Sequence, residues 1–431
     1  MNYEVIMLVL VFVILMALNV PIAFCLLASA VVVLSLSTDF IPVVTAVAQQ
    51  TTTGIDSFVL LAIPFFILSG FLMGRGGIAT RLIEFAKSLV GWFPGGLAFV
   101  NVVGCMLFGS IAGSSAAAVS AIGGFMIPSM TKEGYSKEFG TALTITAATT
   151  GLLIPPSNIL IVYSLASGGI SIAALFLAGY IPGIIVGLFL MGVAMIVALK
   201  KGEKFGKWIS FKSVLHTGGR AFLSLLLVLI VIGGIIAGVF TATEAAAIAV
   251  VYSFILGVIV YREISFKDLP EILINTVTTT SIVMLLIGAS MALSWVLSYL
   301  NIPQNLSAAL LALSDNPFVI LLIINLVLLF VGTFMDMTPA VLIFTPIFLP
   351  VAINLGIDPI HFGIIMVLNL CIGLATPPVG TLLFLGVSIG KTTVPKVIKP
   401  LLPMYIAMIL ALLLVTFFPQ LSLFLPSLIS N

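Results

Sequence analysis

Two proline pairs interrupt apolar segments of this chain, at Gly151-Leu-Leu-Ile-Pro155-Pro156 and at Gly373-Leu-Ala-Thr-Pro377-Pro378. Proline lacks the amide hydrogen that a helix uses, and it disfavours the helical conformation in the residue before it. We therefore expect two helices that unwind at the proline pairs. Unwound backbone at membrane depth is tolerated only where it is buried in protein or lines a polar cavity. Both breaks are thus candidate binding sites.

The composition indicates that these segments lie in a membrane. Of 431 residues, 61% are hydrophobic and 7% are charged, whereas about 25% of the residues of a soluble domain are charged. Apolar stretches of about 20 residues, the length that crosses a bilayer as a helix, recur from end to end. The first is too long and too lightly charged at its start for a cleaved signal peptide. Since only helices satisfy their own backbone within such spans, we predict an all-α polytopic membrane protein.

Ten apolar runs are candidate crossings, and two longer stretches are too long for one simple span. The crossings lie near residues 4–18, 20–36, 57–74, 136–165, 170–199, 220–238, 243–261, 272–300, 360–388 and 400–425. The two longer stretches lie near 95–130 and 317–352, with central breaks at Gly113-Ser114-Ser115 and Asp336-Met337-Thr338. We expect both of them to be re-entrant hairpins.

The basic residues favour this arrangement. If both hairpins return to the side on which they entered, all 16 Lys and Arg residues lie on one side of the membrane. The positive-inside rule makes that side cytoplasmic, so both termini are predicted to be periplasmic. The basic residues fall in five segments: Arg75–Lys87, Lys132–Lys137, Lys200–Arg220, Arg262–Lys267 and Lys391–Lys399.

The two halves of the chain share landmarks at one offset. Pro155 and Pro377 are 222 positions apart, and the same offset links Pro128 with Pro350, Gly134 with Gly356, and Ser114-Ser115 with Asp336-Met337. Five crossings separate corresponding points, so the halves would lie in opposite orientations, as in many secondary transporters. This predicts a first inverted repeat at 1–199, a cytoplasmic linker at 200–219 and a second repeat at 220–431.

Polar groups gather at the breaks and at the hairpin tips. Freed carbonyls and hydroxyls offer oxygen ligands for Na⁺, and half-helix N-termini offer partial positive charge to a carboxylate. The tips are Gly109-Ser110-Ile-Ala-Gly113-Ser114-Ser115 and Gly332-Thr333-Phe-Met-Asp336-Met337-Thr338. Their small residues could also serve close helix packing alone. Asp336 is the most informative acid because an ionisable group within a membrane segment is costly, although it could simply cap a helix.

Other kinds of chemistry find little support. Gly386-Val-Ser-Ile-Gly390-Lys391-Thr392 resembles a phosphate-binding loop but has three intervening residues where that motif has four. The net charge of +2 includes no basic run of the nucleic-acid type. The cysteines and histidines are too isolated for a disulfide framework or a metal centre: Cys25, Cys105, Cys371, His216 and His361. We expect no enzyme, because neither a Ser/His nor a paired-Asp constellation is apparent.

Four motifs resemble, in order, the large permease subunit of the tripartite ATP-independent periplasmic (TRAP) transporters. They are Ile63-Pro-Phe-Phe-Ile-Leu-Ser-Gly70, Gly109-Ser-Ile-Ala-Gly-Ser-Ser115, Ile154-Pro-Pro-Ser157 and Thr376-Pro-Pro-Val-Gly380. The resemblance implies an elevator-type, sodium-coupled importer of the bacterial inner membrane. Its partners would be a small four-helix membrane subunit (DctQ-like) and a periplasmic substrate-binding protein. Without four additional N-terminal helices, the chain resembles the unfused form.

The resemblance also implies a substrate class and site residues. Substrates of the family carry carboxylates, chiefly sialic acid and C4-dicarboxylates, and the sialic acid type is the nearest match. Sodium would bind at Ser110, Ser115, Gly151 and Ile154, and at Thr333, Thr338, Gly373 and Thr376. Ser114, Ser157 and Asp336 are expected to contact the substrate. No Arg or Lys lies near either break, so helix N-termini, hydroxyls and bound Na⁺ would hold the carboxylate.

Two alternatives stay open at this point. One is an anion channel, against which the pair of hairpins argues. The other is a secondary transporter of a different inverted-repeat family that works without a periplasmic binding protein.

Overall fold

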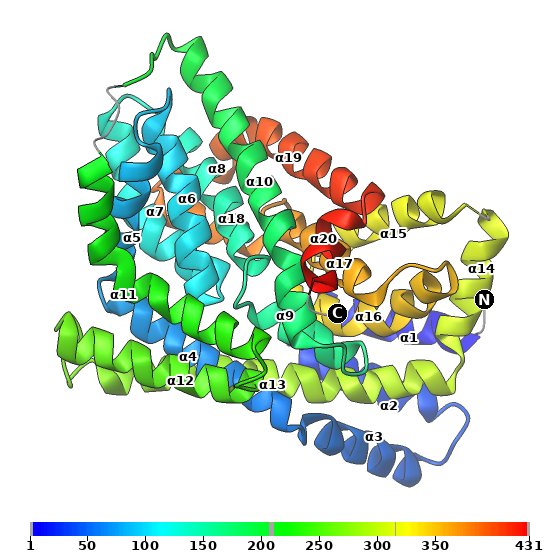
Figure 1. Ribbon diagram of the computed structural model, residues 1–431. Coiled ribbons are helices and arrows are strands. Elements are labelled where there is room, and N and C mark those ends of the chain that lie inside the picture. Colours follow the sequence, from blue (N-terminus) through cyan, green and yellow to red (C-terminus); the bar gives the residue numbers. More distant parts are fainter. Residues whose placement is uncertain (1–2, 207–210, 315, 429–431) are drawn as a thin grey trace.

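The computed structural model describes residues 3–206, 211–314 and 316–428, and the regular secondary structure of these residues is helical throughout (Figure 1). The first half contains α1 (Tyr3–Ala17), α2 (Ile22–Leu34), α3 (Phe40–Ile55), the 3-10 turn η1 (Phe58–Leu61), α4 (Ala62–Arg75), α5 (Ile78–Val90), α6 (Gly96–Ala112), α7 (Ser115–Lys132), α8 (Lys137–Ala148), the 3-10 turn η2 (Thr149–Leu152), α9 (Asn158–Ala166) and α10 (Ile172–Lys200).

The second half contains α11 (Phe211–Ile236), α12 (Ala242–Phe254), the π-helical turn η3 (Ile255–Val260), α13 (Leu269–Tyr299), α14 (Ile302–Leu313), α15 (Pro317–Gly332), α16 (Met337–Asn354), α17 (Pro359–Leu374), α18 (Thr381–Ile389), α19 (Val394–Phe417) and α20 (Gln420–Ser427). Because α11 already begins at Phe211, the connection between the halves is shorter than the predicted linker 200–219. Lys207 of that linker lies outside the described residues.

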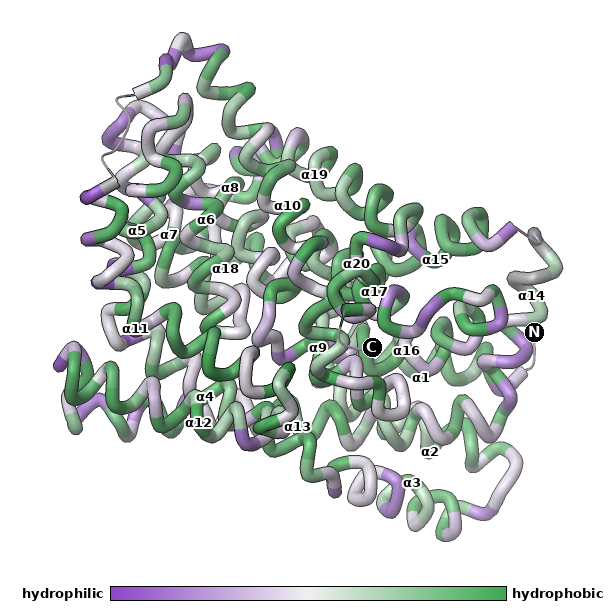
Figure 2. Tube along the Cα trace, viewed as in Figure 1, coloured by the Kyte–Doolittle hydropathy of each residue, from purple (hydrophilic) through white to green (hydrophobic). Residues whose placement is uncertain are grey.

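Long apolar helices confirm the prediction of a polytopic membrane protein. Within the described part of the chain, seven helical segments are long and apolar enough to cross a bilayer: Phe58–Arg75, Ile172–Lys200, Lys212–Ile236, Ala242–Val260, Leu269–Tyr299, Met337–Asn354 and Val394–Phe417. Figure 2 shows the most hydrophilic segments near helix ends at the left and right margins, with hydrophobic helices between them. Met337–Asn354 has the length of a crossing, although we expected it to be the returning arm of a hairpin.

The helices form two layers. The scaffold layer comprises α1–α4 and α11–α13, which lie along the lower part of Figure 1. It is held together by apolar packing of α2, α3 and α13, for example at Leu26, Val43 and Leu293, and by a buried bond of 2.9 Å between the hydroxyls of Ser69 and Ser253. The hairpin layer comprises α6–α10 and α15–α20, and α5 and α14 connect the layers along the chain.

Both predicted helix breaks are present in the hairpin layer. Residues 153–157 leave the helical conformation between η2 and α9, and residues 375–380 do so between α17 and α18. The Ser157 hydroxyl donates to the Leu152 carbonyl (2.5 Å), so it satisfies one of the backbone groups that the first break leaves free.

The first hairpin, α6–α7, begins and ends on the same face of the molecule. The amide of Gly95, just before α6, donates to Oε2 of Glu203 (3.0 Å). The Tyr135 hydroxyl, just after α7, donates to the same oxygen (2.8 Å). Burial and the bond to Glu203 raise the pKa of Tyr135, which keeps this hydroxyl a donor.

The five basic segments also share one face. Arg75 and Arg81 pair with Asp268 (3.8 Å) and Glu263 (3.9 Å), and Arg220 pairs with Glu84 (3.6 Å). Further bonds join the remaining segments to these: Gly206 N to Trp92 O (2.8 Å), Lys201 Nζ to Gly134 O (3.0 Å) and Thr392 Oγ1 to Glu138 Oε1 (3.4 Å). The loops that we placed together by charge are therefore neighbours in space, whereas their cytoplasmic orientation stays a prediction.

Helices α3, α5 and α14 were not predicted, because we treated their segments as loops. In α5, Ile78, Leu82 and Ala86 are buried while Glu84 and Lys87 are exposed. Such a helix has an apolar stripe rather than an apolar circumference, so a search for continuous apolar runs misses it.

Corresponding helices of the two halves keep the offset seen in the sequence. The starts of α7 and α16, of α8 and α17, and of α10 and α19 are each 222 positions apart. The opposite orientation of the two halves in the membrane stays a prediction.

Candidate functional site

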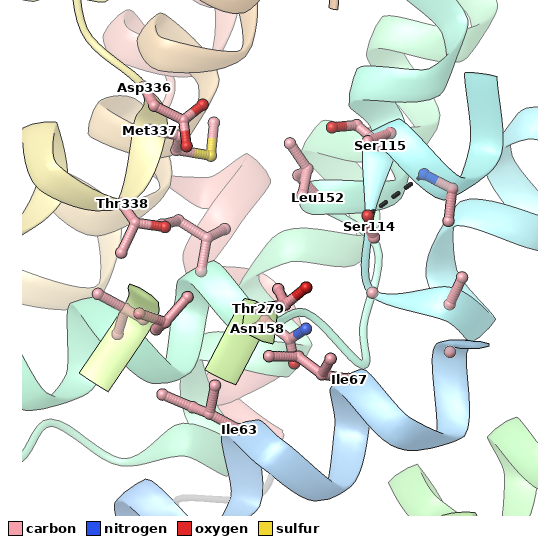
Figure 3. Close-up of a pocket in the computed structure, with 18 of the residues that line it drawn as sticks. Ile63, Ile67, Ser114, Ser115, Leu152, Asn158, Thr279, Asp336, Met337 and Thr338 are labelled. Atoms are coloured by element: carbon pink, nitrogen blue, oxygen red, sulfur yellow. Dashed lines mark hydrogen bonds between the residues drawn. The ribbon is translucent and has the colours of Figure 1, made fainter. Parts of the chain in front are cut away.

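A cavity of about 270 Å³ lies between the two layers (Figure 3). The hairpin layer contributes both hairpin tips and residues that flank the helix breaks, Leu152 and Asn158 at the first and Leu374 and Thr381 at the second. The scaffold layer contributes α4, at Ile63 and Ile67, and α13, at Thr279 and Val283. Four segments that are far apart in sequence therefore meet at one place, and the predicted tips and breaks belong to a single site.

Four helix N-termini converge on this cavity. The first residue of each helix lines it: Ser115 of α7, Asn158 of α9, Met337 of α16 and Thr381 of α18. The first amide groups of a helix have no partner within the helix, and an N-terminus carries roughly half a positive charge. The N-termini thus contribute partial positive charge to a cavity that has no Lys or Arg among its lining residues.

Three of these N-termini lack a side-chain cap. Of the four helices, only α7 has a side-chain cap: the Ser114 hydroxyl accepts from the amide of Ala117 (3.3 Å). The residues that precede α9, α16 and α18, which are Ser157, Asp336 and Gly380, make no capping bond with their side chains. The amides at these helix starts, other than that of Met337, are therefore candidate donors to an anionic ligand.

Asp336 is the one acidic residue among those that line the cavity. It occupies the N-cap position of α16, where its carboxylate interacts with the backbone amide of Met337 but makes no cap bond to a later amide of the helix. Stabilisation of the helix start and ligand binding are therefore both compatible with its position. Its Oδ1 also accepts from the hydroxyl of Thr381 at the start of α18 (3.3 Å). Asp336 therefore joins the second tip to the second break, and its carboxylate offers a hard oxygen to a cation beside two helix N-termini.

Asn158 is a lining residue that the sequence analysis did not single out. Its Oδ1 is buried and has no hydrogen-bond partner, and Figure 3 shows the side chain between Ile67 and Thr279 at the cavity wall. A buried polar atom without a partner is rare and costly. The position directly after Ile154-Pro-Pro-Ser157 is the sequence signal that could have identified it.

Part of the predicted set lines the cavity directly. Ser114, Ser115, Asp336 and Thr338 do so, two of them from each hairpin tip. Ser157, the third expected substrate contact, is fully buried behind the wall and is bonded to Leu152.

The other predicted sodium ligands lie behind the cavity, within the tips and breaks, and are not among its lining residues: Ser110, Gly151, Ile154, Thr333, Gly373 and Thr376. The hydroxyls of Ser110, Thr333 and Thr376 donate to carbonyls of their own helices, at 2.9, 2.7 and 2.7 Å. A hydroxyl that donates in this way keeps its lone pairs free, so each could still bind a cation.

Each hairpin tip packs on its break through a pair of glycines. A Cβ built on Gly151 would lie 2.4 Å from Cα of Gly109, and one built on Gly373 would lie 2.5 Å from Cα of Gly332. Only glycine allows so close a backbone approach. The partner glycines belong to the tip motifs that we grouped with these breaks from the sequence, but the sequence did not indicate that the glycines themselves make the contact.

Residues 9–421 match the family described as "Tripartite ATP-independent periplasmic transporter, DctM component". The chain belongs to this family. It is therefore a large membrane subunit of a TRAP transporter, a multi-pass protein of the inner membrane, and not an enzyme.

Relatives of this TRAP subunit carry different substrate names. The chain is 53% identical to the uncharacterized protein YgiK of Salmonella typhimurium, covering 99% of this chain and 98% of YgiK. It is 42% identical to the C4-dicarboxylate TRAP transporter large permease protein DctM of Pseudomonas aeruginosa (86% and 87% covered). It is also 42% identical to the sialic acid TRAP transporter large permease protein SiaM of Vibrio cholerae (88% and 89% covered). Sequence identity therefore does not favour the relative named for C4-dicarboxylates over the one named for sialic acid.

Among solved structures, the TRAP subunit is similar to the YdaH transporter of Alcanivorax borkumensis, with a TM-score of 0.66. The alignment covers 89% of this chain and 90% of YdaH at 14% identity. It shows a shared fold.

Proposed function

We propose that the chain is the permease of a sodium-coupled transporter that imports a carboxylate solute by an elevator mechanism. The observation that carries this proposal is the convergence of four helix N-termini and one carboxylate, Asp336, on a single cavity. Family membership supports a transport role, and the cavity supports the chemistry of the cargo.

The charge balance of the cavity favours an anion. Four N-termini contribute about two positive charges in total at roughly one half each, against one negative charge from Asp336. A carboxylate can accept hydrogen bonds from the uncapped amides without any Lys or Arg. The lack of a basic residue near either break therefore does not exclude a carboxylate as the ligand.

Sodium is the coupling ion that the oxygen groups favour. The carboxylate of Asp336, the hydroxyls of the tips and the carbonyls freed at the breaks are hard oxygen ligands, which suit Na⁺. A cation bound beside Asp336 would cancel its repulsion of the substrate carboxylate. Each ligand would then raise the affinity for the other, which is the thermodynamic requirement for coupling.

The two layers support an elevator movement. The scaffold wall of the cavity is largely apolar, at Ile63, Ile67 and Val283, so it offers a surface along which the hairpin layer could slide without breaking ion pairs. Amphipathic α5 and α14 connect the layers at corresponding places in each half. We propose that they act as the arms between a static scaffold and a moving hairpin layer.

A small membrane subunit and a periplasmic substrate-binding protein are the proposed partners, in keeping with the tripartite description of the family. The proposed cargo is sialic acid or a C4-dicarboxylate, the substrates in the names of two relatives at equal identity.

Reconstituted uptake tests this function. The chain, its small subunit and its binding protein are placed in proteoliposomes, and uptake of labelled carboxylates is measured with Na⁺ or K⁺ outside. We expect saturable uptake that requires an inward Na⁺ gradient. Uptake that ignores Na⁺, or flux that does not saturate, would refute coupled transport and favour the channel alternative.

A further inference from the structure

A second cleft lies where α8 and α19 begin and α10 ends. It shares no lining residue with the cavity between the two layers. Its volume is about 840 Å³. Three lysines line it, Lys201 just after α10 and Lys396 and Lys399 in the first turns of α19, and we call it the basic cleft. Because helix ends meet here, the basic cleft lies at a boundary of the apolar part of the molecule.

The lysines of the basic cleft are incompletely neutralised. The Lys201 ammonium donates to the carbonyl of Gly134 (3.0 Å) and lies 4.1 Å from the centre of the Tyr135 ring. Lys396 and Lys399 are exposed, one helical turn apart, and form no ion pair with the acidic residues that the structure describes. Three lysines and one glutamate, Glu138, give the lining a net charge of +2.

The same part of α19 offers hydrogen-bond acceptors beside the lysines. Pro400 and Pro403 line the basic cleft. Since proline has no amide hydrogen, it cannot donate to the carbonyl four residues before it. The carbonyls of Lys396 and Lys399 therefore lack their α-helical donors and are candidate acceptors for a ligand hydroxyl.

Apolar surface continues from the basic cleft along α19. Leu402 and Ile406 of this helix have 54% and 60% of their surface exposed. Phe139 and Val197 add apolar groups to the wall of the cleft itself. A soluble anion would leave this surface unused, whereas acyl chains would cover it.

We propose that the basic cleft binds the headgroup of an anionic phospholipid that carries free hydroxyls, such as phosphatidylglycerol. The phosphate lies among the three lysines, the headgroup hydroxyls donate to the carbonyls of Lys396 and Lys399, and the acyl chains lie against α19. Basic pockets between membrane helices are a recurrent form of anionic-lipid site. The bound lipid joins elements of both halves of the chain at the basic face.

Native mass spectrometry of the purified full chain tests this site. Phosphatidylglycerol or phosphatidylcholine is added at equal concentration, and lipid retention is compared between wild type and Lys396→Gln/Lys399→Gln. We expect wild type to retain phosphatidylglycerol in preference, and the double variant to retain it about 30-fold more weakly. Lys396→Arg/Lys399→Arg should restore retention, because the charge is what the phosphate needs.

A matched control is Lys87→Gln/Lys212→Gln, which removes two exposed lysines that do not line the basic cleft. It should retain the lipid as wild type does, and gel filtration checks that each variant is folded. Equal retention of phosphatidylcholine, or an undiminished signal in Lys396→Gln/Lys399→Gln, would overturn the proposal. Displacement of the lipid by an equal concentration of inorganic phosphate would overturn it as well and indicate a site for a soluble anion.

Discussion

Replacing Gly373 with alanine should separate the second hairpin tip from its break. The new Cβ would lie 2.5 Å from both Cα and the carbonyl carbon of Gly332 and 2.7 Å from its oxygen. Carbon atoms in contact lie about 3.5–4.0 Å apart, so the two backbones must move apart by about 1 Å. Overpacking of this kind costs about 1–3 kcal/mol. The equilibrium constant that favours the packed tip and break over the separated ones should therefore fall roughly 5- to 150-fold.

The assay compares uptake in proteoliposomes with the thermal stability of the purified variant. We expect Gly373→Ala to insert in the membrane, to melt at a lower temperature and to lose most of its uptake. Gly124→Ala is the matched control, because a Cβ at Gly124 in α7 meets nothing within 4 Å and alanine favours a helix by about 1 kcal/mol. If Gly373→Ala behaved like Gly124→Ala in both assays, the glycine contact would not be needed to hold the site.

Three further changes test other parts of the account. Asp336→Asn keeps the shape of the side chain but removes the cation ligand, so apparent Na⁺ affinity in uptake assays should fall at least tenfold; an unchanged Na⁺ dependence would place the ion elsewhere. Asn158→Asp adds a negative charge at the start of α9 and should weaken carboxylate uptake more than Asn158→Ala does, as measured by KM; equal effects would mean that Asn158 does not face the anion. Tyr135→Phe removes the hydrogen bond to Glu203 that holds one end of the first hairpin. It should lower the free energy of unfolding by about 1.5 kcal/mol, which is typical of a hydrogen bond to a charged group. An unchanged melting temperature would show that this bond does not hold the hairpin.

The features that sequence predicted are those with strong local signals. A proline pair ends a helix wherever it occurs, so the breaks after Gly151 and Gly373 could be located from the chain alone. Basic residues are scarce, so their distribution was enough to group five loops that the structure brings onto one face. Ser114 and Asp336 were predicted because polar residues are conspicuous within apolar stretches.

The features that sequence missed depend on contacts between distant segments. Asn158 carries no charge, and only its unpartnered oxygen in the folded chain draws attention to it. Each tip was grouped with its break in one sodium site, but the direct contact of Gly109 with Gly151 follows only from the placement of the two helices. Ser157 was expected at the substrate from the family resemblance, but it does not line the cavity and its hydroxyl donates to the Leu152 carbonyl. Helix α5 was missed because its apolar residues form a stripe and not a run.

In the proposed mechanism, helix N-termini, and not basic side chains, hold the carboxylate of the cargo. A high-resolution structure of the transporter with bound substrate measures this most directly, through the distances from the carboxylate oxygens to the surrounding donors. We expect those oxygens to lie about 2.7–3.2 Å from backbone amides at the starts of α9 and α18. A carboxylate paired instead with a Lys or Arg, away from the cavity between the hairpin tips, would contradict the account.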